Sequence, residues 1–380
     1  METLALFATT ARGIEDIACE EVAELARISA KPEVGRISFS GRLEDIYLLN
    51  LKARTINKVF IELCREEFED LEGIYKLARE IDYAWIIDPH QTFAVRSERI
   101  GAHDFTSMDV SRVVGQAIKD SFEGTKGRVL RVNLEDPDVE FYSLVRDNQF
   151  LLGVNTTGPS LHRRGYRVYN HPAALKPTIA YSMLRIGDWT PSKTILDPMC
   201  GGATIPIEAA LWARNSPPGK FRYDFAFCKL KICNRNDFEE LKTKLLGSEI
   251  YSVFPIYAMD KNDRHLKGGI ENAQNAGVSG TINFKLGDAT NISDYPRLDV
   301  DLFAVNPPYG LRAYPKEGVR RLYEKFIGTI KANFEGATLV MISSASKILE
   351  ETFEKLDVTV MNSRSVWHGD LQAKIVKCTV

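Results

Sequence analysis

The sequence predicts a multi-domain α/β protein whose carboxyl-terminal half holds a mostly parallel β-sheet with helices on both faces. Three observations lead to this fold class. A chain of 380 residues exceeds the size of one ordinary hydrophobic core. With 44% hydrophobic and 26% charged residues, the chain has the composition of a soluble globular protein. Apolar strands alternate with helices from about residue 186 onward, and this alternation is typical of a parallel sheet.

The first 160 residues predict a compact α+β arrangement. Ser107 or Asp109 is placed to cap the second helix, whose apolar residues recur at helical spacing. The Asp147-Asn148 pair is expected to bend the last strand. The expected strands are 4–10, 36–41, 92–99, 128–136 and 140–155, and the expected helices are 13–26 and 103–122.

The carboxyl-terminal half predicts seven strands and four helices. A segment of only six residues, 367–372, joins the last two strands, which is too short for a right-handed crossover. One of these two strands is therefore expected to be antiparallel. The expected strands are 194–198, 257–260, 282–288, 300–310, 337–345, 358–364 and 373–380, and the expected helices are 205–215, 263–277, 320–334 and 346–356.

The chain is expected to divide into four segments, with no internal repeat. Two amino-terminal domains are expected at 1–65 and 66–160, and the α/β domain at 186–380. A polar stretch with several glycines and prolines, 161–185, is expected to be a linker.

Four polar motifs follow successive strands of the α/β domain, at the sheet edge where open α/β sheets bind ligands. The first motif contains two glycines, which let the backbone approach a ligand, although a glycine pair is equally typical of a tight turn. Its residues, all candidates for cofactor binding, are Asp197, Pro198, Met199, Cys200, Gly201, Gly202 and Ala203.

The next two motifs each end in an acid. Asp260 can accept hydrogen bonds from both hydroxyls of a ribose, or it can cap the following helix. Asp288 suits an adenine amino group, or it can serve as a turn carboxylate. Their neighbours Lys261 and Ala289 complete the candidate cofactor site.

The fourth motif, Asn306-Pro307-Pro308-Tyr309-Gly310, is the most specific. The prolines fix the backbone and leave carbonyls without a neighbouring amide to compete for them. The Asn306 side-chain oxygen and the Pro307 carbonyl can then both accept from one exocyclic amine and hold it in line with a methyl donor. Tyr309 offers a stacking face for the base. The alternative is a purely structural proline turn.

These motifs together resemble the amino-directed class I methyltransferases. Residues 93–118 resemble a THUMP domain, and residues 161–184 resemble the segment that links THUMP to the catalytic domain. Over nearly its whole length the chain is similar to the THUMP-containing tRNA guanine-N2-methyltransferases of the TrmN type. The first sixty or so residues carry the least specific part of this likeness.

The resemblance implies a Rossmann-like catalytic sheet with an antiparallel last strand. It also implies a ferredoxin-like domain at 1–65 and, at 66–160, a THUMP RNA-binding domain that grips the acceptor end of tRNA. It implies S-adenosylmethionine as the cofactor and N2-methylation of guanine 6 in the acceptor stem of tRNA, with the base flipped out of its helix. Asp197 and loop 199–203 would hold the methionine part, Asp260 the ribose and Asp288 the adenine, and Asn306 would also border the cofactor. The linker 161–185 is expected to fold over the cofactor as well as to join the domains. The loop reads Gly-Gly-Ala where relatives often have Gly-Ser-Gly, which shifts the details of the methionine contact.

Two alternatives stay open. The same chemistry on ribosomal RNA guanine is one, although related ribosomal enzymes are typically much longer and carry a second methylase unit. DNA adenine is a weaker version, because a DNA enzyme has no use for a THUMP-like module. The other alternative is an RNA-binding protein with a silent catalytic fold, against which the intact acids and Asn-Pro-Pro-Tyr motif argue.

Charge and composition narrow the expected partners. The net charge is -2, yet residues 148–187 contain no acid, so Arg163, Arg164 and Arg167 in this stretch are expected to contact RNA phosphates. The six cysteines and six histidines show no metal-ligand spacing, and Cys228 and Cys233 are expected to pack in the 215–254 insertion. Without a membrane-length apolar run or a cleavable leader, we expect a monomeric cytoplasmic protein that binds neither membrane, DNA nor metal.

Overall fold

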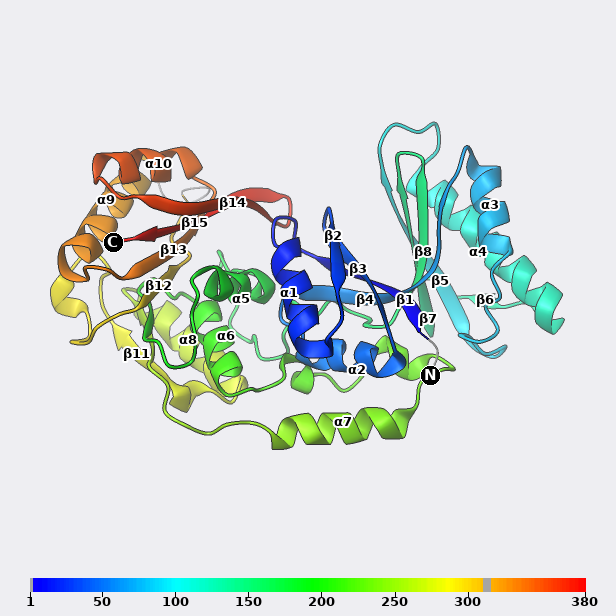
Figure 1. Cartoon of the computed structure of the whole chain (residues 1–380), viewed down its shortest axis with the longest axis horizontal. Helices are drawn as coiled ribbons and strands as arrows, with labels where there is room; N and C mark the ends of the chain where they lie inside the picture. Colours follow the sequence, from blue (N-terminus) through cyan, green and yellow to red (C-terminus); the bar gives the residue numbers. More distant parts are fainter. Residues whose placement is uncertain (1–2, 310–315) are drawn as a thin grey trace.

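The computed structural model describes residues 3–309 and 316–380, which form two β-sheets side by side (Figure 1). The amino-terminal sheet has eight strands in the order β2-β3-β1-β4-β8-β7-β5-β6. The carboxyl-terminal sheet has seven strands in the order β11-β10-β9-β12-β13-β15-β14.

The amino-terminal sheet joins the two expected amino-terminal domains. β4 pairs with β8 in antiparallel register from Phe60–Asn155 to Glu67–Gln149, so that hydrogen bonds cross the boundary expected near residue 65. A single hydrophobic core also spans both parts. The elements are β1 (Leu4–Thr10), α1 (Glu15–Ala26), β2 (Ala30–Glu33), β3 (Arg36–Gly41), α2 (Leu43–Lys52), β4 (Ile56–Glu67), α3 (Leu71–Arg79), β5 (Thr92–Ile100), α4 (Ser107–Lys126), β6 (Arg131–Val132), β7 (Val139–Arg146) and β8 (Gln149–Asn155).

Three local expectations for this half were wrong. The stretch 140–155 is a hairpin rather than one bent strand, because Asp147 takes a left-handed φ of 50° and reverses the chain. The strand expected at 128–136 shrinks to β6, since the Asn133 side chain accepts from Glu135 N and Asp136 N and starts a turn. The cap of α4 is Thr106, which forms a reciprocal capping box with Asp109.

The carboxyl-terminal sheet is parallel except at one edge. β15 runs antiparallel to both β13 and β14, which confirms the expected antiparallel strand. Its strands are β9 (Ile195–Asp197), β10 (Ile256–Asp260), β11 (Ile282–Leu286), β12 (Leu302–Val305), β13 (Thr338–Ser343), β14 (Val360–His368) and β15 (Leu371–Thr379). Its helices are α5 (Pro177–Ile186), α6 (Thr204–Ala213), α8 (Asp263–Asn275), α9 (Lys316–Asn333) and α10 (Ser346–Lys355), with 3₁₀ turns η3 (Ser279–Thr281) and η4 (Ile292–Asp294).

The order of these strands fixes the place of a ligand site. The chain adds strands outward on one side from β9 to β11 and then returns to place β12 on the other side of β9. Open α/β sheets bind ligands at such a switch point, beyond the carboxyl ends of the two central strands. Asp197 ends β9, and Asn306 directly follows β12.

Two segments connect the halves more tightly than a flexible linker would. The second part of the expected linker is α5, whose residues Pro177 to Leu184 are buried and belong to the catalytic core. The insertion 214–255 contains η1 (Pro218–Phe221), η2 (Ala226–Lys229) and α7 (Arg235–Gly247), and it runs along the amino-terminal half (Figure 1). Phe225, Phe227 and Phe238 of this insertion pack in the amino-terminal core. Apolar burial on both sides therefore holds the halves together.

In the described ranges 3–309 and 316–380, no helix combines the length and the apolar character needed to cross a membrane.

Candidate active site

The carboxyl ends of β9, β10 and β12 bring three of the predicted motifs together. Asp197 is only 2% exposed, and its Oδ1 accepts from Met199 N at 3.1 Å. Burial raises the pKa of this carboxyl well above its usual value, and the nearby Asp260 carboxylate raises it further, against the Met199 hydrogen bond. Pro198 separates Asp197 from Met199 in the chain. The neighbouring Cys200 thiol is also buried, and burial raises its pKa.

The glycine loop between β9 and α6 is held in an unusual backbone conformation. Gly201 has φ 52°, and a Cβ there would lie 3.3 Å from the His171 ring, so both the conformation and the close approach favour glycine. Ala203 precedes α6 with φ 59°, a conformation that costs a non-glycine residue on the order of 1 kcal/mol or more. Gly202 stands between these two residues in the turn, and its carbonyl accepts a hydrogen bond from Asn272 Nδ2 at 3.0 Å.

Asp260 ties the loop to the next strand. Its Oδ2 accepts from Gly201 N and its Oδ1 accepts from Asn262 N, both at 2.8 Å. Asn262, and not Asp260, caps α8 by accepting from Arg264 N and His265 N. Each carboxylate oxygen has two acceptor positions, so Asp260 keeps one on each oxygen for a pair of ligand hydroxyls. Lys261 follows it, exposed on the surface.

Asp288, after β11, is the third acid. Its Oδ1 accepts from both the backbone N and the Oγ1 of Thr290 at 2.8 Å, so it closes a local turn. Burial acts to raise its pKa, but the Thr290 hydrogen bonds outweigh burial and leave the pKa below its usual value. The carboxylate is therefore ionised, and its Oδ2, which accepts no hydrogen bond from the described residues, is left for a ligand. Ala289, next in the chain, is buried.

Most hydrogen-bonding groups of the Asn-Pro-Pro-Tyr motif are engaged within the protein, whereas the Pro307 carbonyl has no partner among the described residues. Asn306 Nδ2 donates to the Ala173 carbonyl at 3.1 Å, while its Oδ1 accepts from the Tyr309 hydroxyl. The Pro308 carbonyl accepts from Tyr323 OH at 3.2 Å. Burial raises the pKa of Tyr309. Tyr309 thus turns inward onto Asn306, where we had expected an open stacking face, and Gly310 lies outside the described residues.

Residues 168–176, here called the strap, cover the glycine loop. Asn272 on α8 holds the strap: its Oδ1 accepts from Val168 N and Tyr169 N at 2.9 Å, and its Nδ2 donates to the Tyr169 carbonyl at 3.1 Å. The Tyr169 ring lies where a side chain on Gly268 would clash, and its hydroxyl contacts His265 Nδ1 at 2.6 Å. The cavity left between strap, loop and Asn306 is only about 20 Å³. This cavity is smaller than a nucleoside, and neither Asp260 nor Asp288 lines it.

The strap lies within the linker 161–185, which we expected to fold over the cofactor, but sequence reasoning missed its anchors. Asn272, Tyr169 and Gly268 lie in segments that we interpreted as an ordinary helix and a linker. The paired glycines Gly268-Gly269 inside α8 were the available signal, because glycine weakens a helix and is kept there when something packs against the backbone.

The linker arginines do not form the expected phosphate-binding group. Arg164 is buried: its Nε and Nη2 lie 3.2 and 3.3 Å from the two oxygens of Glu208, which is fully buried, so its assignment to RNA is wrong. Arg167 is half-buried and donates to Leu175 O and Thr204 Oγ1. Arg163 alone is exposed.

The insertion cysteines show no metal cage. Cys228 and Cys233 pack against the amino-terminal core, and Tyr47 OH contacts Cys233 Sγ at 3.6 Å. Across residues 3–309 and 316–380, no group of three or more His, Cys, Asp or Glu side chains is arranged to hold a metal ion.

Three family models match the chain. Residues 164–374 match the RMKL-like methyltransferase domain, residues 68–155 match the THUMP domain, and residues 5–60 match the RlmL ferredoxin-like domain.

Two archaeal relatives match this chain over nearly the full length of both proteins. The tRNA (guanine(6)-N2)-methyltransferase of Archaeoglobus fulgidus is 40% identical over 97% of this chain and 91% of its own, and that of Methanocaldococcus jannaschii is 37% identical over 98% and 99%. The ribosomal RNA large subunit methyltransferase K/L of Vibrio campbellii is 29% identical, and the match covers 90% of this chain but 49% of that protein. The solved structure of TrmN from Thermus thermophilus has a TM-score of 0.75 at 24% identity, over 100% of this chain and 99% of that chain, and so shows the same fold. The chain belongs to the THUMP-containing, RMKL-like methyltransferase family.

Proposed function

We propose that this protein transfers a methyl group from S-adenosylmethionine to N2 of a guanine in tRNA, at position 6 of the acceptor stem. The observation that carries the proposal is the position of Asn306-Pro307-Pro308-Tyr309 at the end of β12, beside the glycine loop at the end of β9. Groups that can bind an amine and the acids Asp197 and Asp260 thus meet at one switch point of a methyltransferase sheet.

The residues present fit the cofactor. The backbones of Gly201 and Gly269 approach so closely that a Cβ on Gly269 would lie 2.9 Å from the Gly201 carbonyl, so α8 packs directly against the glycine loop and holds its conformation. We assign the methionine part to Asp197 and to the loop from Met199 to Ala203. We assign the ribose to Asp260, with Lys261 beside it, and the adenine to Asp288 and Ala289. The cofactor supplies an electrophilic methyl group.

The internal hydrogen bonds of Asn306 have to open before the target amine can bind. Asn306 Nδ2 would then release the Ala173 carbonyl, and Tyr309 would release Asn306 Oδ1. The guanine N2 amine would donate its two hydrogens to Asn306 Oδ1 and the Pro307 carbonyl. These contacts direct the nitrogen lone pair toward the methyl carbon, so that the N–C bond forms as the S–C bond breaks. The nitrogen then loses one proton to solvent.

The THUMP match and the two archaeal relatives support tRNA as the substrate. The ribosomal relatives give less support to ribosomal RNA as the substrate. The match covers only about half of the Vibrio campbellii protein, and its 29% identity is lower than that of the archaeal tRNA enzymes. We further propose that the enzyme is monomeric and prefers RNA to DNA. We also propose that it works in the cytoplasm, in keeping with free thiols at all six cysteines.

Labelling of unmodified total tRNA with methyl-tritiated S-adenosylmethionine, followed by digestion to nucleosides, tests this function. We expect the label in N2-methylguanosine, and we expect Asn306→Ala to incorporate label about 10²- to 10³-fold more slowly. Label in a methylated adenosine or cytidine, or equal labelling by Asn306→Ala, would overturn the proposal.

A further inference from the structure

The loop that carries the Asn-Pro-Pro-Tyr motif is held in place from outside the motif. Its two prolines have no N–H, so at these positions the backbone can be held only through its carbonyls. The Pro307 carbonyl has no partner among the described residues, and it is one of the two acceptors that we assign to the target amine. The Pro308 carbonyl accepts a hydrogen bond from Tyr323 OH at 3.2 Å. Whatever fixes Tyr323 therefore also fixes this part of the loop.

Tyr323 lies in the hydrophobic core beside the catalytic sheet. It belongs to the buried face of α9, with Val319 and Ile327 at helical spacing, and its side chain is 0% exposed. The same core cluster contains Val305, the last residue of β12. Close packing holds the Tyr323 ring in one position, so its hydroxyl meets the loop from a fixed point.

Ser343 supports the Tyr323 hydroxyl. It is the last residue of β13, the strand that pairs with β12 in parallel. Tyr323 OH and Ser343 Oγ lie 2.9 Å apart, and Ser343 Oγ accepts from Ala345 N at 3.0 Å. A phenol has one hydrogen, and Tyr323 donates it to Pro308, so the Ser343 hydroxyl has to donate to Tyr323. The hydrogen bonds therefore run in one direction, from the Ala345 amide to the loop carbonyl.

This chain of hydrogen bonds is closed to solvent. Tyr323 and Ser343 are both 0% exposed, so water cannot replace either hydroxyl without a change in packing. Burial raises the pKa of Tyr323 to about 12, against the Ser343 hydrogen bond, and the phenol stays a neutral donor near pH 7. A buried hydroxyl without an acceptor is unfavourable, which favours the conformation of the loop that offers the Pro308 carbonyl.

We infer that Tyr323, supported by Ser343, is a positioning residue for methyl transfer, because it holds the Pro308 carbonyl and thereby keeps the free Pro307 carbonyl in place for the target amine. The ring of Pro308 fixes its φ, so one soft rotation, ψ of Pro308, separates the two carbonyls. β12 fixes the other end of the loop, at Asn306. An acceptor held in this way needs no reorganisation when the amine arrives. The inference rests on the proposed function, since it takes this amine as the reacting group.

The test is single-turnover methylation of unmodified tRNA by full-length Tyr323→Phe, measured over a range of tRNA concentrations at saturating S-adenosylmethionine. The substitution removes the hydroxyl and keeps the buried ring. Tyr83→Phe is the matched control, because Tyr83 is also 0% exposed and donates to the Ala78 carbonyl at 2.6 Å, in the amino-terminal core. Ser343→Ala, alone and combined with Tyr323→Phe, is the second variant. Calorimetry gives the cofactor affinity of each protein.

We expect Tyr323→Phe to lower the maximal rate about five- to tenfold, with the half-saturating tRNA concentration and the cofactor affinity unchanged. Ser343→Ala should lower the rate less and should add nothing in the double variant, because its effect passes through the Tyr323 hydroxyl. Tyr83→Phe should lose similar thermal stability yet methylate at the parental rate. A parental rate in Tyr323→Phe, or an equal loss of rate in Tyr83→Phe, would overturn the inference.

Hydrogen exchange in the free protein distinguishes this inference from the proposed function. The amides of Asn306 and Tyr309, resolved by overlapping peptides, should exchange faster in Tyr323→Phe than in the parent or in Tyr83→Phe. Unchanged exchange at both amides would overturn the inference. Faster exchange in Tyr323→Phe, together with a parent that methylates no tRNA, would support the role of Tyr323 in holding the loop and refute the proposed function alone.

Discussion

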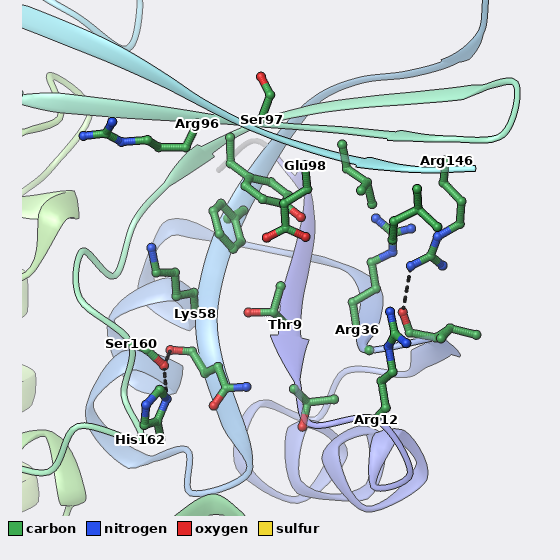
Figure 2. A pocket seen from close by; sticks show the side chains of 18 of the residues that line it. Thr9, Arg12, Arg36, Lys58, Arg96, Ser97, Glu98, Arg146, Ser160 and His162 are labelled. Atoms are coloured by element: carbon green, nitrogen blue, oxygen red, sulfur yellow. Dashed lines mark hydrogen bonds between the residues drawn. The ribbon is translucent and has the colours of Figure 1, made fainter. Parts of the chain in front are cut away.

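Two regions of the molecule satisfy their polar groups in opposite ways: the catalytic edge at the ends of β9, β10 and β12, and a basic cleft in the amino-terminal half (Figure 2). Six cationic side chains line this cleft, Arg12, Arg36, Lys58, Arg96, Arg146 and Lys176. At the edge, Asp260 accepts from Gly201 N and Asn262 N, and both ends of the Asn306 amide have protein partners. In the cleft, Arg36 keeps an unpartnered buried nitrogen among the described residues, and cations outnumber acids. At the edge the protein supplies partners for its own polar groups, whereas the cleft carries a surplus of positive charge.

This contrast separates two kinds of arginine. Arg164 has a full set of internal partners, with Glu208 Oε1 at 3.2 Å and the Leu161 and Arg54 carbonyls at 2.8 and 3.1 Å. Arg12 is exposed at the mouth of the cleft. The first arginine stabilises the join between the halves, and the second is available to a ligand.

The largest effect on stability is expected from Arg164→Leu. It leaves the buried Glu208 carboxylate with only Tyr166 OH at 3.1 Å and Arg54 Nη1 at 4.0 Å, which should cost about 3–5 kcal/mol of unfolding free energy. Urea denaturation measures this loss. The neighbouring Arg163→Leu, at an exposed position, should change stability by less than about 0.5 kcal/mol. Equal stability of the two variants would mean that Arg164 does not need its internal partners.

The next effect is on catalysis. Asn306→Ala should lower single-turnover methylation about 10²- to 10³-fold, because one acceptor for the reacting amine is lost. Cofactor affinity, measured by calorimetry, should change little, and Asn275→Ala on the exposed end of α8 should behave as the parent. Methylation at the parental rate would remove Asn306 from the reaction.

Cofactor binding is the next way to test the edge. Asp260→Ala should weaken the binding of S-adenosylmethionine by about 1.5–3 kcal/mol per lost hydrogen bond, because the substitution removes a charged acceptor for the ribose hydroxyls. The control is Asp263→Ala, an exposed acid whose partner is Lys267 at 2.6 Å. Titration calorimetry that gave both variants the parental affinity would place the ribose elsewhere.

The smallest effect concerns Asp197. Its folded pKa is raised, so the protonated form is favoured on folding: this stabilisation is complete below the unfolded pKa and is lost as the pH rises through the folded pKa. Asp197→Asn keeps the acceptor for Met199 N without the charge and should raise the thermal midpoint of the free protein by a few degrees near pH 7. The gain should shrink toward about pH 4. A gain that grew at low pH would contradict the buried-acid explanation.

The two regions also differ in how far the sequence could predict them. Asp197, Asp260 and Asn306 each follow a strand directly, so the strand pattern alone brought them to one edge. Arg12, Arg36 and Arg146 come from separate elements, and no local spacing links them. Arg164 was misread because its partner, Glu208, lies 44 residues further along, and an acid-free stretch looked like free positive charge. The linker was expected to fold over the cofactor, but its anchoring by Asn272 and the inward turn of Tyr309 onto Asn306 depend on tertiary contacts.

The most direct measurement of the central claim is mass-spectrometric mapping of the methylated nucleotide when the full-length enzyme is offered unmodified tRNA and large-subunit ribosomal RNA in equal amounts. We expect a single product, N2-methylguanosine at guanine 6 of tRNA, with the ribosomal RNA unmodified. A methyl group on another base, at another position of the tRNA, or predominantly on the ribosomal RNA would contradict the proposed function.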